Sequence, residues 1–235
     1  MKIVDYRKLR PNNITHPYFR HLLLLIYWPF YGLAFLSVER LLPLDFKPVS
    51  CAWDAFIPFN EWFVIPYYFW FVFLFGMLLY TGLFEVPAFK KMMWFIMVTY
   101  SVTMIIYIIF PNCQDLRPTE FTRDNILVDI AKGLYAFDTN TNVCPSIHIL
   151  GAFACCFTGW HSKRFGTPLY RVLFTAVTLL ICVSTLFMRQ HSIVDVVSGT
   201  ALSFAVYPFV YFRKDAPDPI PPWEETEEKV PALTK

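Results

Sequence analysis

Long apolar runs, separated by short polar stretches, constrain this chain more than any other feature of its sequence. Most runs approach the length of a helix that crosses a bilayer, which needs about 20 residues. Hydrophobic residues make up 56% of the 235 residues and charged residues only 16%, a balance too apolar for an ordinary soluble domain. We therefore expect an all-α integral membrane protein that forms one helix bundle.

The runs predict six membrane-spanning helices. We place them at residues 22–38, 62–84, 92–110, 145–160, 169–188 and 191–212, with a break at 85–91 between the second and the third. No small-residue cleavage site follows the first run, so we interpret it as an uncleaved span and not as a signal peptide. Residues 1–212 then form a single six-span membrane domain. The Pro- and Glu-rich residues 213–235 are expected to be a disordered cytoplasmic tail.

Basic residues predict the orientation of the bundle. Six spans place both termini on one side of the membrane. That side carries Lys2, Arg7, Lys8, Arg10, Arg20, Lys90, Lys91, Lys163, Arg164, Arg171, Arg213 and Lys214. The other side carries half as many, namely Arg40, Lys47, Arg117, Arg123, Lys132 and Arg189. The positive-inside rule therefore places both termini in the cytoplasm.

Two polar motifs lie where apolar runs begin, and they predict where chemistry takes place. The first is Cys144-Pro145-Ser146-Ile147-His148, and the second is Arg189-Gln190-His191-Ser192-Ile193-Val194-Asp195. The spacing between their histidines fits two spanning helices of about 20 residues and a turn. Both histidines are therefore expected at the same non-cytoplasmic face, whether periplasmic, extracellular or lumenal. Polar residues at such positions usually mark catalysis or ion handling.

The first motif predicts an anion site. Pro145 suits the first position of a helix, because its missing N–H would have no partner within the helix. With Cys144 as the cap residue, the N–H groups of Ser146 and Ile147 stay free, and with the helix dipole they attract a phosphate. The Ser146 hydroxyl adds a donor. His148 lies within the first turn, close enough to exchange a proton with a bound group.

The second motif predicts a nucleophile. His191 and Asp195 are four residues apart, so on a helix they share a face. A carboxylate there holds one imidazole nitrogen as N–H and leaves the other free to attack. Arg189 supplies fixed positive charge, as does Arg117 from the long polar stretch 112–143. A loop of that length within a compact bundle is more often functional than idle. This set requires no metal and no cofactor.

Three motifs together resemble the signature of the type-2 phosphatidic acid phosphatase superfamily, whose integral-membrane members form six-helix bundles. They are Arg117-Pro118, Pro145-Ser146-x-His148 and His191-x-x-x-Asp195. The resemblance covers roughly residues 60–210. It implies a metal-independent enzyme that acts on the phosphate of a lipid.

The resemblance also implies a role for each matching residue. The histidine at position 191 attacks phosphorus and forms a phosphohistidine, while Asp195 orients it. His148 protonates the leaving group. The phosphate is held by Arg117, Ser146 and the backbone of Ile147.

Two positions depart from the family pattern. The family's first motif has a lysine where this chain has Phe110, and its third motif has Ser-Arg where this chain has Ser184-Thr185. Arg189 lies one helical turn after Thr185, so on a continuous helix it replaces the missing charge. Loss of Arg189 is then expected to cut turnover severely. The run 184–191 also resembles the branch that includes inositol phosphorylceramide synthases, which transfer a phosphoryl head group to an alcohol.

We therefore expect a lipid phosphate phosphatase, with a phospholipid head-group phosphotransferase as the alternative. A non-catalytic lipid-phosphate binder or transporter is the competitor from another class. A metal-dependent oxygenase is disfavoured, because three of the five histidines (His16, His21 and His161) suit interfacial anchors and leave too few ligands. The net charge of +2 gives no reason to expect a nucleic-acid partner. The lipid, the acceptor, the membrane and the oligomeric state, a homo-oligomer included, stay open.

Several other polar residues on the predicted outer side leave alternatives open. Cys51, Cys113 and Cys144 are compatible with a disulfide there, but the sequence assigns no pair. Asp54 and Glu61 are either solvated ends of an interfacial segment or part of the substrate entrance.

Overall fold

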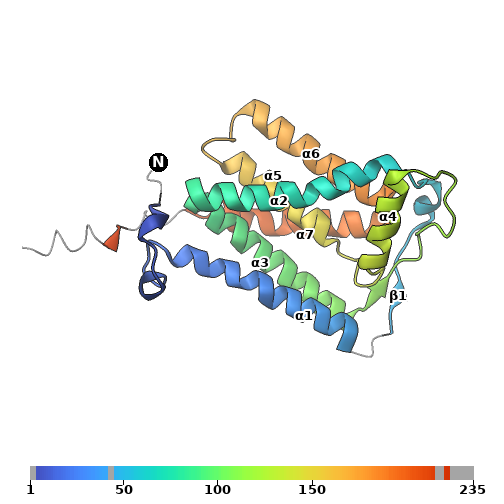
Figure 1. Ribbon diagram of the computed structural model, residues 1–235, viewed down its shortest axis with the longest axis horizontal. Coiled ribbons are helices and arrows are strands. Elements are labelled where there is room, and N and C mark those ends of the chain that lie inside the picture. The colour runs from blue at the N-terminus through green and yellow to red at the C-terminus, as the bar shows by residue number, and fades with distance from the viewer. Residues whose placement is uncertain (1–3, 42–44, 215–219, 223–235) are drawn as a thin grey trace, which may run out of the picture.

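Helices dominate the structure, a computed structural model that describes residues 4–41, 45–214 and 220–222 (Figure 1). The α-helices are α1 (Tyr27–Leu41), α2 (Val64–Phe84), α3 (Val86–Ile109), α4 (Ile126–Phe137), α5 (Ile147–His161), α6 (Pro168–Phe187) and α7 (Ile193–Tyr211). Short 3-10 helices cover Tyr6–Lys8, Pro11–Asn13, Arg20–Ile26, Ala52–Phe56 and Glu61–Phe63. Two short parallel strands, β1 (Lys47–Pro48) and β2 (Asn112–Cys113), form the one sheet within the described ranges.

Within the described parts of the chain, five helical segments are long and apolar enough to cross a membrane. They are Arg20–Arg40, Glu61–Phe84, Val86–Ile109, Pro168–Phe187 and Ile193–Tyr211. These segments fit an integral membrane protein. The remaining apolar helix of the bundle, α5, has only 15 residues. At 1.5 Å per residue it is about 22 Å long, less than the hydrocarbon core of about 30 Å.

The short helix α5 forms the centre of the bundle. Every residue from His148 to Gly159 is buried, and α2, α3, α6 and α7 all pack against this helix. Small residues make this close packing feasible; they are Gly151, Ala152, Ala154, Cys155, Cys156 and Gly159. Because neighbouring helices surround α5, its backbone is sheltered from lipid and its length need not match the bilayer.

The observed helices follow the predicted spans closely, with one clear exception. The predicted break at 85–91 is wrong, because α3 begins at Val86 and only Glu85 separates it from α2. Pro87 lies in the first turn of α3, where its missing N–H costs nothing because N–H groups there have no partner within the helix. The Glu85 carboxylate accepts hydrogen bonds from the Ser162 hydroxyl (2.7 Å) and the Lys163 N–H (2.6 Å), which ties this corner to the end of α5. Of the predicted tail, residues 215–219 and 223–235 lie outside the described residues.

The polar segment 112–143 lies at one end of the bundle. It contains α4, which runs across the helix ends near the starts of α2 and α7 (Figure 1). The N-terminal segment and the C-terminal end of α7 lie together at the opposite end (Figure 1). The two histidine motifs lie at the starts of α5 and α7. They meet at the end of the bundle that holds α4, where the Tyr135 hydroxyl bonds to the Met188 carbonyl.

We predict that Gly151→Ala destabilises the protein relative to the matched change Gly76→Ala in α2. A Cβ at position 151 would lie 2.8 Å from the Trp70 ring and 2.9 Å from the Tyr100 hydroxyl, whereas a Cβ at position 76 meets no atom within 4 Å. Overpacking of this kind costs about 1–3 kcal/mol. Thermal unfolding of the detergent-solubilised variants measures the difference, and equal transition temperatures would contradict the prediction.

Candidate functional site

Two histidines from different helices meet at the start of α5. The His148 Nδ1 lies 3.2 Å from His191 Nε2, and the Ser146 Oγ lies 3.0 Å from the same nitrogen. On the other side of the ring, His191 Nδ1 lies 3.2 Å from Asp195 Oδ2. All four side chains are buried. A proton held on Nδ1 by the carboxylate leaves the lone pair of Nε2 directed toward His148 and Ser146.

A capping box at the start of α7 fixes the Asp195 carboxylate. Ser192 is the N-cap residue; its N–H and hydroxyl donate to Asp195 at 2.8 and 2.9 Å, and the Asp195 N–H donates to the Ser192 hydroxyl at 3.2 Å. His191 therefore precedes the helix, and the expectation that it shares a helical face with Asp195 is wrong. The two side chains meet because Ser and Asp satisfy each other's backbone N–H groups at this helix end.

The start of α5 differs from its predicted form. The helix begins at Ile147 with Ser146 as the N-cap, so Pro145 is not its first residue, and the Cys144–Pro145 peptide bond is cis. The Ser146 N–H points to the Asp195 carbonyl at 3.4 Å. The N–H groups of the first helical turn, from Ile147 onward, have no partner within the helix. The helix thus begins two residues later than expected, and the free N–H groups predicted to bind an anion shift along the chain with it.

Asn112 holds the turn that precedes α5. Its side-chain oxygen accepts from the N–H groups of Val143 (2.9 Å) and Cys144 (2.8 Å), and its amide nitrogen donates to the Cys144 carbonyl (2.9 Å). The Tyr107 hydroxyl donates to the Pro145 carbonyl at 2.7 Å. This turn is therefore fixed by side chains at the end of α3 and just beyond it, a feature that the local sequence does not reveal.

Arg117 reaches from the polar segment to the residue beside His191. Its guanidinium donates to the carbonyls of Tyr135 (3.1 Å) and Thr139 (2.8 Å) and to the side-chain oxygen of Gln190 (2.6 Å). It also lies over the Tyr135 ring, 4.8 Å from the centroid. The structure thus brings Arg117 against the residue that precedes His191, as a positive charge held by α4 and the loop after it.

Arg189 is directed toward backbone carbonyls. Its Nε donates to Leu116 (3.0 Å), and its Nη1 donates to Asp54 (2.6 Å) and Ile57 (2.9 Å). Helix α6 ends at Phe187, and Arg189 has a positive φ of 52°. No continuous helix carries this side chain one turn beyond Thr185. The guanidinium instead ties residues 54–57 and the segment around Leu116 to the turn between α6 and α7.

Asp54 and Glu61, whose roles the sequence leaves open, are both buried. The Asp54 carboxylate accepts from the N–H groups of Ile193 (2.8 Å) and Cys51 (2.7 Å), so it helps to cap α7. Glu61 accepts from Arg123 at 2.9 Å and from Asn125 at 3.2 Å. Neither carboxylate is a solvated segment end.

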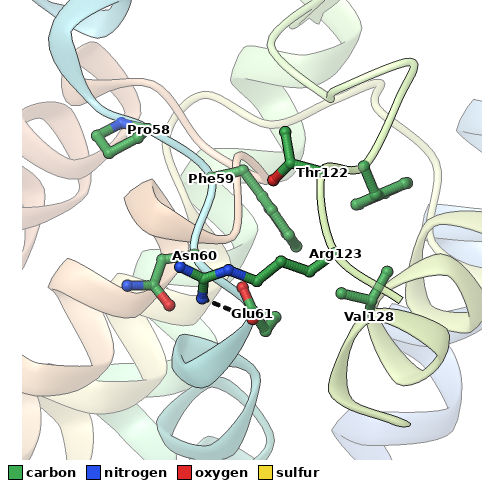
Figure 2. Close-up of a pocket in the computed structure, with 8 residues that line it drawn as sticks. Pro58, Phe59, Asn60, Glu61, Thr122, Arg123 and Val128 are labelled. Carbon is green, nitrogen blue, oxygen red and sulfur yellow. Dashed lines mark hydrogen bonds and ion pairs between the residues drawn. The ribbon is translucent and has the colours of Figure 1, made fainter. Parts of the chain in front are cut away.

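Glu61 lines a small pocket of about 240 Å³ (Figure 2). The other lining residues are Pro58, Phe59, Asn60, Phe121, Thr122, Arg123 and Val128. None of them belongs to the histidine cluster. The pocket is smaller than the roughly 300–1,000 Å³ that drug-sized ligands occupy.

Two aromatic residues of α2 complete the surroundings of His148. The rings of Tyr67 and Trp70 lie 4.8 and 4.6 Å from its imidazole, centroid to centroid. The sequence could not single them out, because eight of the twelve residues 62–73 are aromatic.

Asp138, which follows α4, was also missed from the sequence. Burial raises the pKa of its carboxyl, whereas the charges of His191 and Arg117 and the Tyr67 hydroxyl lower it. Its carboxyl therefore lies close to the proposed anion site. The length of the polar stretch 112–143 predicted a functional segment, but nothing in the sequence pointed to Asp138 within it.

The described residues contain no group of three or more His, Cys, Asp or Glu side chains that could hold a metal ion. Cys51, Cys113 and Cys144 are free thiols, and Phe110 is the exposed residue that caps the C-terminus of α3.

Comparisons with known proteins make no assignment: the chain matches no family model, no curated protein and no solved structure. The side chains around His191 therefore provide the indication of its chemistry. Two facing imidazoles, a carboxylate on one of them, a nearby guanidinium and a helix N-terminus suit attack on a tetrahedral oxyanion.

We predict that Arg189→Ala lowers the thermal stability of the protein, because it removes the guanidinium donor from the carbonyls of Leu116 and Ile57 and leaves the Asp54 carbonyl with only the Ile57 N–H. A buried acceptor without a partner costs about 1–3 kcal/mol. Thermal unfolding in detergent measures the loss. If Arg189 acted only on a substrate, the variant would unfold at the temperature of the wild type.

We predict that Asp138→Asn changes how phosphate binding depends on pH. Below its raised pKa the Asp138 carboxyl is neutral; above it, a carboxylate repels a bound anion, so affinity falls as pH rises. The Asn variant lacks this loss, and its affinity should exceed that of the wild type several-fold at the upper end of a titration between about pH 5 and about pH 8. Calorimetric titration with inorganic phosphate measures both profiles, and superimposable curves would contradict the prediction.

Proposed function

We propose that this protein is a membrane-embedded lipid phosphate phosphatase that acts through a phosphohistidine intermediate. The arrangement of His191 carries the proposal. Its Nδ1 faces the Asp195 carboxylate and its Nε2 faces His148, each at 3.2 Å. A histidine that only bound an anion would not need a carboxylate to free its other nitrogen for attack.

In the first half of the proposed reaction, His191 Nε2 attacks phosphorus. The P–N bond forms as the bond between phosphorus and the lipid oxygen breaks. The leaving alkoxide takes a proton from His148, and Asp195 stabilises the positive charge that develops on the His191 ring.

In the second half, a water molecule attacks the phosphohistidine. His148 now accepts the proton of the water as the new P–O bond forms. The P–N bond breaks, and inorganic phosphate leaves with both histidines restored. No step in this scheme calls for a metal ion or another cofactor.

Arg117, Ser146 and the Ile147 N–H are the proposed ligands of the phosphate oxygens. A guanidinium and first-turn N–H groups supply donors of fixed position for the charge of the transition state. We assign Arg189 an indirect part in this scheme, because its guanidinium donates hydrogen bonds to backbone carbonyl groups.

We further propose that α5 is a sixth span, that both termini are cytoplasmic and that the site faces the non-cytoplasmic side. The distribution of basic residues supports this orientation. The position of the N-terminal segment and the end of α7 at the same end of the bundle is compatible with it (Figure 1).

Transfer to an alcohol is the second candidate, and the burial of the site favours it. Ser146 and Asp195 are fully buried, and His148 and His191 are only 8% and 5% exposed. A phosphohistidine sheltered from bulk water survives long enough to meet another acceptor. The protein would then be a head-group phosphotransferase.

The test is release of inorganic phosphate from a panel of lipid phosphates by detergent-purified protein in the presence of a metal chelator. We expect release that the chelator does not abolish and that His191→Ala removes. Acid-labile, base-stable phosphate on the protein should appear in the wild type during turnover.

The outcomes separate the candidate functions. A new phospholipid that appears only with an added alcohol, and that needs His191, would assign the transferase. Binding of lipid phosphate without either product, unaffected by Asp195→Asn, would assign the non-catalytic binder and overturn the enzyme.

A further inference from the structure

We propose that Tyr67 and Gln190 donate hydrogen bonds to the phosphoryl group in transfer and so contact the substrate beside Arg117. This inference rests on the proposed function and adds two residues that no sequence motif marks. It follows from buried hydrogen-bond donors that have no acceptor within the described part of the chain.

The orientation of the Gln190 side chain is set by Arg117. Because a guanidinium offers only donors, the amide oxygen of Gln190 must face it, and the two atoms lie 2.6 Å apart. The amide nitrogen is therefore turned away from Arg117. It is buried and has no partner. Gln190 directly precedes His191, the proposed nucleophile, in the chain.

The Tyr67 hydroxyl is a second donor of this kind. The side chain is 1% exposed. Its oxygen lies near enough to the Asp138 carboxyl to lower the pKa of that group, but no atom is placed with the geometry of a full hydrogen bond to it. The ring packs 4.8 Å from the His148 imidazole, and Arg117 and Asp138 are its charged neighbours. Tyr67 thus approaches from α2 the same group of residues that Gln190 approaches from the turn before α7.

A third unpaired donor joins the two. The Arg117 Nε is also buried without a partner, although the other guanidinium nitrogens are bonded. Most buried polar groups in folded proteins are paired, so unpaired donors on Arg117 and on two of its neighbours call for an acceptor. A phosphoryl group brings several acceptor oxygens and no obligatory donor. It can satisfy all three residues at once.

The main competing explanation is structural, because a small rotation would let the Tyr67 hydroxyl bond to the Asp138 carboxyl. The substrate-binding and the structural explanation predict opposite effects of Tyr67→Phe on the stability of the free protein. If the hydroxyl serves the substrate, Tyr67→Phe removes an unpaired buried group, so the free protein keeps or gains stability while oxyanion binding weakens. If the hydroxyl instead bonds to Asp138 and stabilises the fold, Tyr67→Phe lowers the stability of the free protein.

The experiment measures orthovanadate binding and thermal unfolding for the wild type, Tyr67→Phe, Gln190→Glu and Tyr31→Phe. Orthovanadate serves as a probe of phosphoryl transfer. Gln190→Glu keeps an acceptor for Arg117 but removes the donor. Tyr31→Phe is the matched control, because the Tyr31 hydroxyl is also buried and unpaired, but its ring packs on Tyr100 and not on either histidine.

We expect Tyr67→Phe and Gln190→Glu to weaken orthovanadate binding by about 10-fold or more, as for the loss of a hydrogen bond to a charged group. Both should lower kcat/KM for a lipid phosphate. Neither Tyr67→Phe nor the control should lower the unfolding temperature, and the control should bind orthovanadate like the wild type.

The possible failures are distinguishable. Wild-type affinity in both site variants, or a lower unfolding temperature of Tyr67→Phe without weaker binding, overturns this inference and leaves the proposed function standing. A wild-type protein that binds no oxyanion and releases no phosphate overturns both.

Discussion

The Asp195 carboxylate is the group on which the rest of the site depends. It accepts from the Ser192 N–H and hydroxyl, which starts α7, and it lies within hydrogen-bond distance of the His191 ring. The cap of a membrane helix and the orientation of the proposed nucleophile are therefore one interaction. A buried carboxylate without such partners would be strongly destabilising in an apolar bundle, so the fold and the site stabilise each other.

Buried polar side chains hold the other chain segments in place around this carboxylate. Asp54 caps the next N–H of α7, Arg189 binds the carbonyls of the segment that contains Asp54, and Asn112 fixes the turn before α5. In a bilayer, irregular backbone is tolerated only where protein groups satisfy it. These side chains meet that requirement, and they do so at the end of the bundle where the motifs converge.

The apolar helices and the meeting of His148 with His191 could be predicted, because run length and spacing are local properties of the sequence. The start of α5 could not, since the turn before it is held by Asn112 and Tyr107 from another part of the chain. Arg189 was assigned to the substrate for the same reason. Its carbonyl partners lie between 73 and 135 residues earlier in the chain, and no periodicity signals them.

The Ile193 N–H bonds to a carboxylate 139 residues earlier in the chain. During synthesis, the segment around Asp54 is made long before the helix that it caps. Its carboxylate therefore lacks the Ile193 N–H as a donor until α7 has been made. The Asp195 carboxylate cannot orient His191 until α7 has been made and has docked. A chain that stops before α7 would contain most of the bundle but would lack Asp195, so the proposed chemistry would depend on the last helix to be assembled.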